Sequence, residues 1–172
     1  TQMDGNMVRD NDGFLWFCYY GGVGRYDGYE VRYYEPGPDS VSGPGTMAIV
    51  ADKDGALWIL TKDSGLNRYD KETDTFTHYR HDPDNANSIA SDISDGFCPQ
   101  RLFIDRTGRL LIGTMGGLDI YDMRTDTFTH HRHDPNNPNS LSSNNVTAVI
   151  QGGDGIIWVG TSGGGLSRFD PD

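Results

Sequence analysis

Long apolar runs and helical periodicity are both missing from this sequence. No segment approaches the roughly 20 apolar residues of a membrane-spanning helix, and the opening TQMDGNMVRD has neither the basic nor the apolar region of a signal peptide. No stretch sustains an apolar repeat of 3.6 residues, and 23 glycines and 8 prolines interrupt the chain. We therefore expect an all-β protein. The missing signal segment says little about compartment, because the sequence does not open on methionine.

Cysteine and basic residues are also scarce. Two cysteines are too few for a disulfide framework, and no structural bridge is expected. Cys18 lies in the apolar run FLWFCYY and should be a small buried side chain, whereas Cys98 lies in SDGFCPQ, which is expected to form a loop. The 14 basic residues face 25 acidic ones, and the net charge of -11 would repel phosphate backbones and anionic membranes. Nucleic acid is therefore not expected as a partner.

The sequence shows no recognisable set of catalytic residues. The chain has three glutamates, Glu30, Glu35 and Glu72, all at expected outer-strand or turn positions. There is no Ser/His/Asp grouping and no glycine-rich phosphate loop. We therefore assign no catalytic residue, metal or cofactor and do not expect an enzyme. A lyase or hydrolase stays as an alternative, which turnover of a polysaccharide would establish.

What the sequence does contain is a repeat. Four segments share an Asp- and Gly-rich turn, an apolar run and a final aromatic-Asp pair: DNDGFLWFCYYGGVGRYD (10–27), DKDGALWILTKDSGLNRYD (52–70), DRTGRLLIGTMGGLDIYD (105–122) and GGDGIIWVGTSGGGLSRFD (152–170). Their marker glycines, Gly13, Gly55, Gly108 and Gly155, are 42, 53 and 47 residues apart. A period of about 40–50 residues is typical of the blades of a β-propeller.

Each unit divides into short strands separated by glycine turns. The phrase TFTHYRH adds a fourth strand, so each blade is predicted to be a four-stranded antiparallel meander that covers its apolar faces by packing on its neighbours. We expect one partial β-propeller over 1–172, with blade 1 at about 6–35, blade 2 at about 46–82, blade 3 at about 99–134 and a partial blade 4 at about 146–172. About three full blades and a partial fourth would form an open arc of a larger propeller, cut from a longer protein.

The phrase of the fourth strand occurs twice, as TDTFTHYRHDP (73–83) and TDTFTHHRHDP (125–135). Its histidines raise the question of a metal site. His78 and His81 would point to opposite faces of a strand, whereas His131 and His133 would share a face, as metal ligands do. Because position 131 is Tyr79 in the other copy, we favour a solvated edge strand and expect the histidines to be dispensable.

The turns DNDG and DKDG raise a second metal question, because Asp-x-Asp-Gly can ligate calcium. An EF-hand loop would need further oxygen ligands and a Glu six residues after the glycine, and the sequence has neither. The same place reads DRTG and GGDG in the other two units. Turn formation, with glycine adopting positive φ, is the favoured interpretation.

The repeat units DGALWILTKDSGLNRYD and DGIIWVGTSGGGLSRFD, the linkers at 87–90 and 139–142 and the phrase TDTFTHYRHDP together resemble the two-component regulator propeller repeat. The resemblance covers essentially the full chain. Two departures exist: Leu111 stands where the other blades have tryptophan, and blade 1 has Cys18-Tyr19 in place of the usual Gly-Thr.

That family builds the extracytoplasmic sensor domains of bacterial hybrid histidine kinases and related membrane receptors, including some with diguanylate cyclase outputs. The resemblance implies a ligand-sensing fragment in the periplasm, as part of a membrane-anchored receptor. It also implies partners: the remaining blades, kinase or cyclase domains outside this chain, and a homodimer formed through those domains.

Strand order indicates where a ligand would bind. The loops after the second strand of each blade and those between blades should emerge on one face, around the central channel. Residues that differ there while the scaffold repeats are the candidate site, namely Tyr19, Tyr20, Lys62, Asp63, Met115, Phe97 within the extra stretch 92–99, and Arg101, at an inner-strand position filled elsewhere by Ala48 and Ala148. Tyrosines, a charged pair and an arginine would suit a small polar ligand such as an oligosaccharide.

Two further interpretations stay open from the sequence. The tyrosines could instead be blade packing, and Lys62 and Asp63 an exposed ion pair. The whole arc could also serve as a platform for binding other proteins, since propeller faces suit that role. Saturable sugar binding without turnover would favour the sensor.

Overall fold

The computed structural model describes residues 3–94 and 99–170, and these form four antiparallel sheets in chain order. Blade 1 comprises β1 (Met3–Arg9), β2 (Leu15–Tyr19), β3 (Gly22–Tyr26) and β4 (Val31–Tyr34). Blade 2 comprises β5 (Thr46–Ala51), β6 (Leu57–Thr61), β7 (Leu66–Asp70) and β8 (Thr75–Tyr79).

Blade 3 opens with a short 3-10 helix, η1 (Pro99–Arg101), and continues with β9 (Leu102–Ile104), β10 (Leu110–Thr114), β11 (Gly117–Asp122) and β12 (Thr127–His131). Blade 4 contains β13 (Val146–Gln151), β14 (Ile157–Thr161) and β15 (Gly165–Phe169). Each sheet is a meander in which every strand pairs with the next. The expected all-β propeller arc, with three four-stranded blades and a three-stranded fourth, is confirmed.

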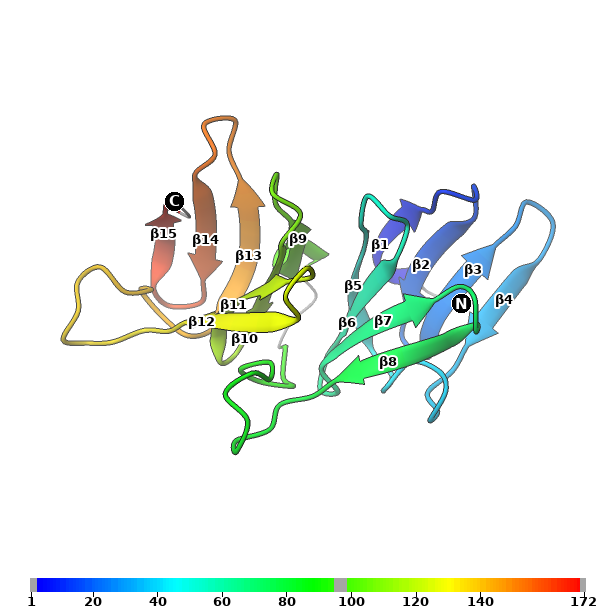
Figure 1. Cartoon of the computed structure of the whole chain (residues 1–172), viewed down its shortest axis with the longest axis horizontal. Helices are drawn as coiled ribbons and strands as arrows, with labels where there is room; N and C mark the ends of the chain where they lie inside the picture. Colours follow the sequence, from blue (N-terminus) through cyan, green and yellow to red (C-terminus); the bar gives the residue numbers. More distant parts are fainter. Residues whose placement is uncertain (1–2, 95–98, 171–172) are drawn as a thin grey trace.

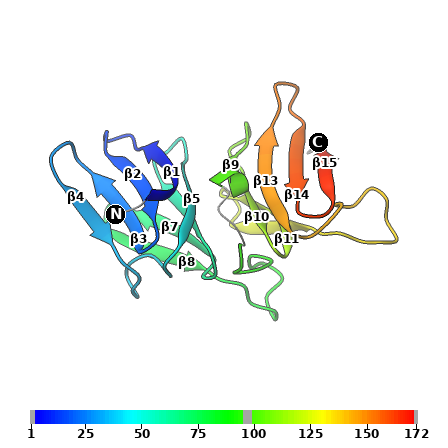
Figure 2. The same ribbon diagram turned by 180° about the vertical axis from the view of Figure 1, so that it is seen from behind.

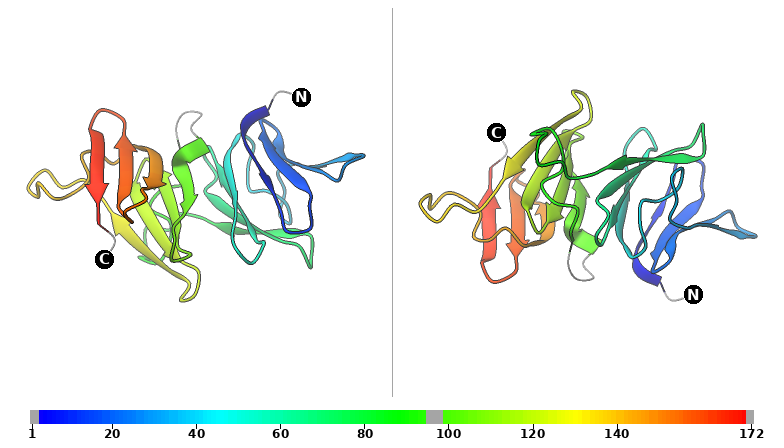
Figure 3. Two further views of the ribbon diagram at one scale, coloured as in Figure 1. Left: turned by 90° about the horizontal axis from the view of Figure 1, so that it is seen from above. Right: turned by 90° about the horizontal axis from the view of Figure 1, so that it is seen from below.

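The four blades follow one another along the long axis of the molecule, from the blue N-terminal sheet to the red C-terminal one (Figure 1). The view from behind and the views from above and below show the same succession (Figures 2 and 3). Contacts between blades centre on their first strands, because β1 lies against β5, β5 against β9, and β13 against both η1 and β9. The first strands are therefore the inner ones, as in a propeller.

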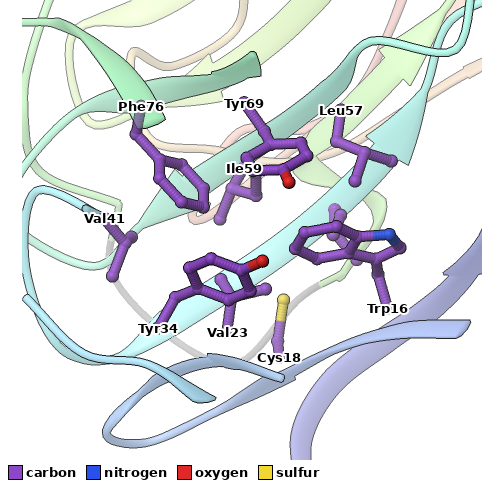
Figure 4. Close-up of a cluster of buried hydrophobic side chains, with 10 residues drawn as sticks. Trp16, Cys18, Val23, Tyr34, Val41, Leu57, Ile59, Tyr69 and Phe76 are labelled. Carbon is purple, nitrogen blue, oxygen red and sulfur yellow. The ribbon is translucent and has the colours of Figure 1, made fainter. Parts of the chain in front are cut away.

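Blades 1 and 2 are joined by a buried aromatic cluster (Figure 4). Trp16 of β2 is fully buried and stacks on Tyr34 of β4, with ring centroids 5.4 Å apart, while Tyr69 of the next blade approaches it at 4.7 Å. Leu57 and Ile59 of β6 complete the apolar contact. Each blade therefore supplies the cover that its neighbour lacks.

The same contact recurs farther along the arc. Trp58 lies between blades 2 and 3, against Leu110 and Tyr121. Between blades 3 and 4 the equivalent place holds Leu111, which packs on Val149 and Ile157. A smaller side chain at this position leaves the fold intact because the surrounding residues are also smaller and aliphatic.

An aspartate in the first turn of a blade holds its tryptophan. Asp10 accepts a hydrogen bond from the Trp16 indole Nε1 at 2.7 Å, and Asp52 accepts one from Trp58 at 3.2 Å. In blade 3, where Leu111 replaces the tryptophan, the same carboxylate oxygen of Asp105 instead pairs with Arg109. The other oxygen of each aspartate accepts backbone N–H groups of its own turn. The first aspartates of DNDG and DKDG therefore act as turn formers, as the sequence predicts.

Trp158 corrects one expectation. It occupies the same register position as the other two tryptophans, opposite Arg168, but it is only half-buried. Trp16 and Trp58 are covered by the blade that follows them, whereas among the described residues no blade follows blade 4. The repeat predicts that all three equivalent tryptophans are largely buried between blades, and this prediction is wrong for Trp158.

Asp74 clamps blade 1 to blade 2. Its carboxylate accepts hydrogen bonds from the hydroxyls of Tyr34 (2.9 Å) and Tyr69 (2.8 Å) and pairs with Arg32 at 2.5 Å. Burial acts to raise the pKa of this carboxyl, but the two hydroxyls and the arginine outweigh it, so the pKa of Asp74 lies below its usual value of 3.8. The clamp is therefore strongest when Asp74 is ionised.

We expect Asp74→Asn to cost about 1–2 kcal/mol at pH 7. A folded-state pKa below the unfolded value gives a contribution that is complete above about pH 4 and is lost as the pH falls through the folded pKa. The stability gap between variant and parent should therefore shrink toward pH 3 in urea unfolding experiments. Asp54→Asn, at an exposed turn, is the matched control and should show no such gap. A gap that is constant with pH would contradict the clamp.

Candidate functional site

The turns between second and third strands lie on one face of the arc, together with the ends of the linkers between blades. The meander dictates this, because a second strand ends where the first strand of the same blade begins. We call this face the rim and define it by residues from blades 1 to 3 and the linkers, namely Tyr20, Gly45, Lys62, Asp63, Ile93 and Met115.

Backbone hydrogen bonds join the rim from blade to blade. The N–H of Gly45 donates to the carbonyl of Tyr20 (2.6 Å), and the carbonyl of Gly45 accepts from the N–H of Lys62 (3.0 Å). In the next linker, Ser94 donates to the Lys62 carbonyl (2.7 Å) and Met115 donates to the Ile93 carbonyl (3.0 Å). The structure therefore brings Tyr20, Lys62 and Met115, which come from three different blades, onto one continuous edge.

The backbone conformation at this junction requires glycine at position 45. Its φ is +70°, a left-handed conformation that favours glycine, and a Cβ atom there would lie 3.3 Å from the Cβ of Lys62. The rim is thus held by backbone geometry and does not depend on the side chains that project from it. Those side chains are free to differ between blades.

Several rim side chains are exposed. Tyr20 is 69% exposed, Met115 42% and Ile93 50%, and Lys62 and Asp63 are also exposed. Lys62 and Asp63 form no ion pair with each other in the described part of the chain, and Asp63 instead accepts a hydrogen bond from the Ser64 hydroxyl (3.1 Å). The rim therefore presents an aromatic ring, a cation, a carboxylate and two apolar groups to solvent.

The other residues selected from the sequence lie elsewhere. Tyr19 is buried and packs edge-on against Tyr33, with ring centroids 5.2 Å apart. Arg101 ends η1 directly before β9, is 1% exposed, and donates from Nη1 to the carbonyl of Val146 in blade 4. It is therefore a contact between blades 3 and 4. Phe97 lies outside the described residues, as does Cys98.

The repeated histidines have a role that the sequence interpretation missed. His78 contacts the Ser40 carbonyl through Nε2 (2.7 Å), and His130 contacts the Ala86 carbonyl in the same way (2.9 Å). Both carbonyls belong to the linker that enters the blade. For His78 and His130 the expectation of solvated edge histidines is wrong, because the linker folds back over the outer strand and its carbonyls contact the two imidazoles.

The last histidine of each phrase closes the linker itself. Nδ1 of His81 contacts the Ile89 carbonyl (2.8 Å), and Nδ1 of His133 contacts the Leu141 carbonyl (2.7 Å). His131 packs on Phe169 of blade 4, with ring centroids 4.5 Å apart. One blade earlier, Tyr79 packs on Tyr121 in the equivalent position. Among the described residues, no three His, Cys, Asp or Glu side chains gather closely enough to hold a metal ion.

Blade 3 adds a contact between a buried aspartate and a histidine to this arrangement. Asp119 of β11 has no exposed surface, and its Oδ1 lies 2.6 Å from Nδ1 of His130, while its Oδ2 accepts the N–H of Ala90 (2.8 Å). Burial raises the pKa of the Asp119 carboxyl, although the hydrogen bonds from His130 and Ala90 act against this. The equivalent residue of blade 2, Asn67, likewise accepts a linker N–H, from Ser42 at 2.7 Å.

The fold and the rim define an arc of β-propeller blades whose variable side chains are displayed on one face. The family model of the two component regulator propeller matches residues 140–163, which run from the last linker into blade 4. The family resemblance seen in the sequence is confirmed by this match together with the structural likeness described next.

Solved structures agree with the family match. The chain is similar to the extracellular domain assigned to the hybrid two component system BT3049 from B. thetaiotaomicron, with 25% identity, a TM-score of 0.82 and coverage of 95% of this chain and 23% of that one. It is also similar to the extracellular domain assigned to the one component system BT4673 from the same organism, with 26% identity, a TM-score of 0.78 and coverage of 99% and 24%. The chain thus spans about a quarter of either extracellular-domain chain.

A more distant likeness concerns the fold alone. Virginiamycin B lyase from Staphylococcus aureus shares 16% identity with a TM-score of 0.57, over 96% of this chain and 55% of that one. No curated protein sequence matches the chain. Helical structure in the described residues is limited to stretches too short and polar to cross a membrane.

Proposed function

We propose that this chain is a ligand-sensing part of a bacterial membrane receptor of the two-component type and that its rim binds a small polar ligand, most suitably a neutral oligosaccharide. The observation that carries the proposal is the rim: turns from three blades that repeat in backbone but differ in side chain, joined by hydrogen bonds into one edge. The similarity to extracellular domains of signalling systems supports the receptor context.

The chemistry of the rim favours a sugar. The exposed ring of Tyr20 offers a flat apolar face on which a pyranose can stack, and Lys62 and Asp63 offer a donor and an acceptor for hydroxyl groups. A net charge of -11 disfavours strongly anionic glycans. In this proposal the domain lies outside the cytoplasmic membrane, in the periplasm, and hands its signal to a kinase or cyclase domain, and binding is not followed by turnover.

The test is calorimetric titration of the chain with neutral oligosaccharides selected on a glycan array. We expect saturable binding that Tyr20→Ala weakens by about 1–3 kcal/mol without an appreciable change in melting temperature, because the ring is exposed and contributes little to packing. Tyr29→Ala is the matched control, since Tyr29 is 94% exposed on the opposite face. Equal losses from both variants, or steady hydrolysis of the bound sugar, would overturn the proposal.

A protein-interaction platform is the second candidate. Blade 1 exposes a group of large apolar side chains near its outer strand, Tyr26, Tyr29, Val31 and Tyr33, and such patches commonly mark protein contacts. A protein partner bound there would be lost on Tyr29→Ala and retained on Tyr20→Ala. The same pair of variants therefore separates the two functions.

A further inference from the structure

His130 of β12 lies between two groups that accept hydrogen bonds. Its Nε2 is 2.9 Å from the carbonyl oxygen of Ala86, in the linker before blade 3, and its Nδ1 is 2.6 Å from Oδ1 of Asp119. A carbonyl oxygen has no hydrogen to give, so Nε2 must carry one. The short contact on the other side needs a second hydrogen, either on Nδ1 or on the carboxyl group. The docked arrangement therefore holds two hydrogens on the pair.

This number exceeds by one what the two groups carry when they are apart near neutral pH. A neutral imidazole has a single ring hydrogen, and an ionised carboxylate has none. If the additional proton leaves to water, one of the two contacts must bring an imidazole lone pair against an acceptor. The carboxylate of Asp119 is charged and fully buried, so it should keep the remaining hydrogen on Nδ1. Nε2 then faces the Ala86 carbonyl without a hydrogen, and that contact opens.

The same phrase in blade 2 does not need the additional proton. His78 contacts the Ser40 carbonyl through Nε2 at 2.7 Å, but the residue opposite it on the third strand is Asn67 instead of an aspartate. The Asn67 carboxamide accepts the N–H of Ser42 and donates to the carbonyl of Ile59. A neutral imidazole with its hydrogen on Nε2 therefore satisfies the contact in blade 2.

Solvent reaches the histidine of the pair but not the aspartate. The side chain of His130 is 22% exposed, whereas that of Asp119 is fully buried. The imidazole lines a cavity of about 650 Å³ beside the linker, which gives the proton a path to water. The other charged or titratable groups around the pair are His81, Asp82 and Asp84 of the linker and His131 and Arg132 at the end of the outer strand. They influence the pH at which the proton leaves, but the two acceptors decide how many hydrogens the contacts need.

The contact with Ala86 lies next to a second attachment of the linker to the outer strand. The side chain of Asn87 accepts the N–H of Phe128 at Oδ1 (2.7 Å) and donates from Nδ2 to the carbonyl of Asp126 (2.9 Å). Loss of the neighbouring histidine contact should loosen this attachment, so the Phe128 N–H should exchange with solvent more readily. Phe76 is the internal reference in blade 2, because its N–H donates to the carbonyl of Asp39 in the preceding linker (3.2 Å).

We propose that Asp119 and His130 form a proton-operated latch for the linker before blade 3. With the proton bound, the imidazole bridges Asp119 and Ala86 and the linker is closed on β12. When the proton is released to water, the remaining ring hydrogen moves from Nε2 to Nδ1 and the linker opens at Ala86. Blade 2, which has Asn67, stays closed. This inference is independent of what the rim binds.

The test is a nuclear magnetic resonance titration of the nitrogen-15-labelled 172-residue chain from about pH 4 to 8, in which long-range spectra show which ring nitrogen of each histidine carries hydrogen. We expect Nε2 of His130 to carry hydrogen at the acid end and to lose it as the pH rises, while Nε2 of His78 keeps its hydrogen throughout. The hydrogen-exchange protection factor of the Phe128 amide should fall about five- to tenfold across the same transition, and that of Phe76 should not change.

Asp119→Asn is the decisive variant, because its amide group can donate to Nδ1 and lets a neutral imidazole keep its hydrogen on Nε2. We expect this variant to abolish the transition and to leave Phe128 protected across the whole range. Asp122→Asn, on the same strand but paired with Arg124, is the matched control and should show the transition of the parent.

Three results would overturn the latch. If Nε2 of His130 keeps its hydrogen over the whole range in the parent, the contacts do not depend on an additional proton. If Asp119→Asn shows the same transition as the parent, the carboxylate does not set it. Equal loss of protection at Phe128 and Phe76 would assign the change to a general loosening of the arc instead of to the linker before blade 3.

Discussion

Replacing Trp58 with alanine is expected to lower the free energy of unfolding by about 3–5 kcal/mol, among the largest effects of any single change in this chain. The indole is 1% exposed and sits between blades 2 and 3, where Tyr79 and Tyr121 contact it at 5.5 and 5.4 Å. Truncation removes these contacts, leaves a cavity at the blade interface and frees the Asp52 carboxylate from its hydrogen bond. Urea unfolding followed by far-ultraviolet circular dichroism measures the loss.

The chain contains its own control for this change. Trp158 has the same register position but is only half-buried, so Trp158→Ala should cost no more than about 1–2 kcal/mol. Acrylamide should quench Trp158 readily and the other two tryptophans poorly. Equal stability losses for the two variants, or three equally quenched tryptophans, would show that blades do not pack through the tryptophan positions as described.

Asp119→Ala is expected to have an effect of similar size, about 3–5 kcal/mol, because it removes a fully buried carboxylate on which a buried N–H and a half-buried imidazole both depend. The N–H of Ala90 and Nδ1 of His130 both bind this carboxylate, and both lie where the linker meets blade 3. Loss of the pair should release residues 86–90 from the blade, detectable as faster hydrogen exchange there. Unfolding in urea gives the magnitude.

Asp119→Asn is the informative companion. Blade 2 already has Asn67 at this position, so the amide should keep the bond from Ala90 and cost far less than alanine. Because burial raises the folded-state pKa of Asp119 above 3.8, its contribution is complete below that value and is lost as the pH rises through the folded pKa.

The stability of the Asn variant relative to the parent should therefore increase as the pH rises from about 4 through the folded-state pKa of Asp119. The charged or titratable groups that act on the Asp119 carboxylate are His130 and Arg132, which offset part of the change. A relative stability that falls with pH in this window would contradict the assigned direction of the pKa.

The repeat made the blades predictable from the sequence. Turn glycines, the Trp positions and the doubled outer-strand phrase recur in the same order along the chain. Local strand propensity agrees with the sheets seen in the structure. Cys18 is fully buried, as its apolar surroundings indicated, and burial raises the pKa of its thiol to about 12. Trp158 was misjudged because its burial depends on a neighbouring blade, not on its own segment.

The site was harder to predict, because it depends on how linkers fold back. The contacts of His78 with Ser40 and of His130 with Ala86 join residues about 40 positions apart, and no local sequence pattern predicts them. The repeated Asp/Asn at positions 67 and 119, each aligned with a histidine, was a usable signal that a comparison of the blades could have found. Arg101 was judged by its strand position, yet its guanidinium turns into the interface with blade 4.

Nuclear magnetic resonance of the 19.0 kDa chain, titrated with a neutral oligosaccharide that binds it, tests the rim most directly. Amide shifts should concentrate at Tyr20, Gly45, Lys62, Asp63 and Met115, which share one face and are linked through their backbones. Shifts that instead concentrate at the opposite turns, 10–13 and 52–55, would contradict the assignment of the ligand to the rim.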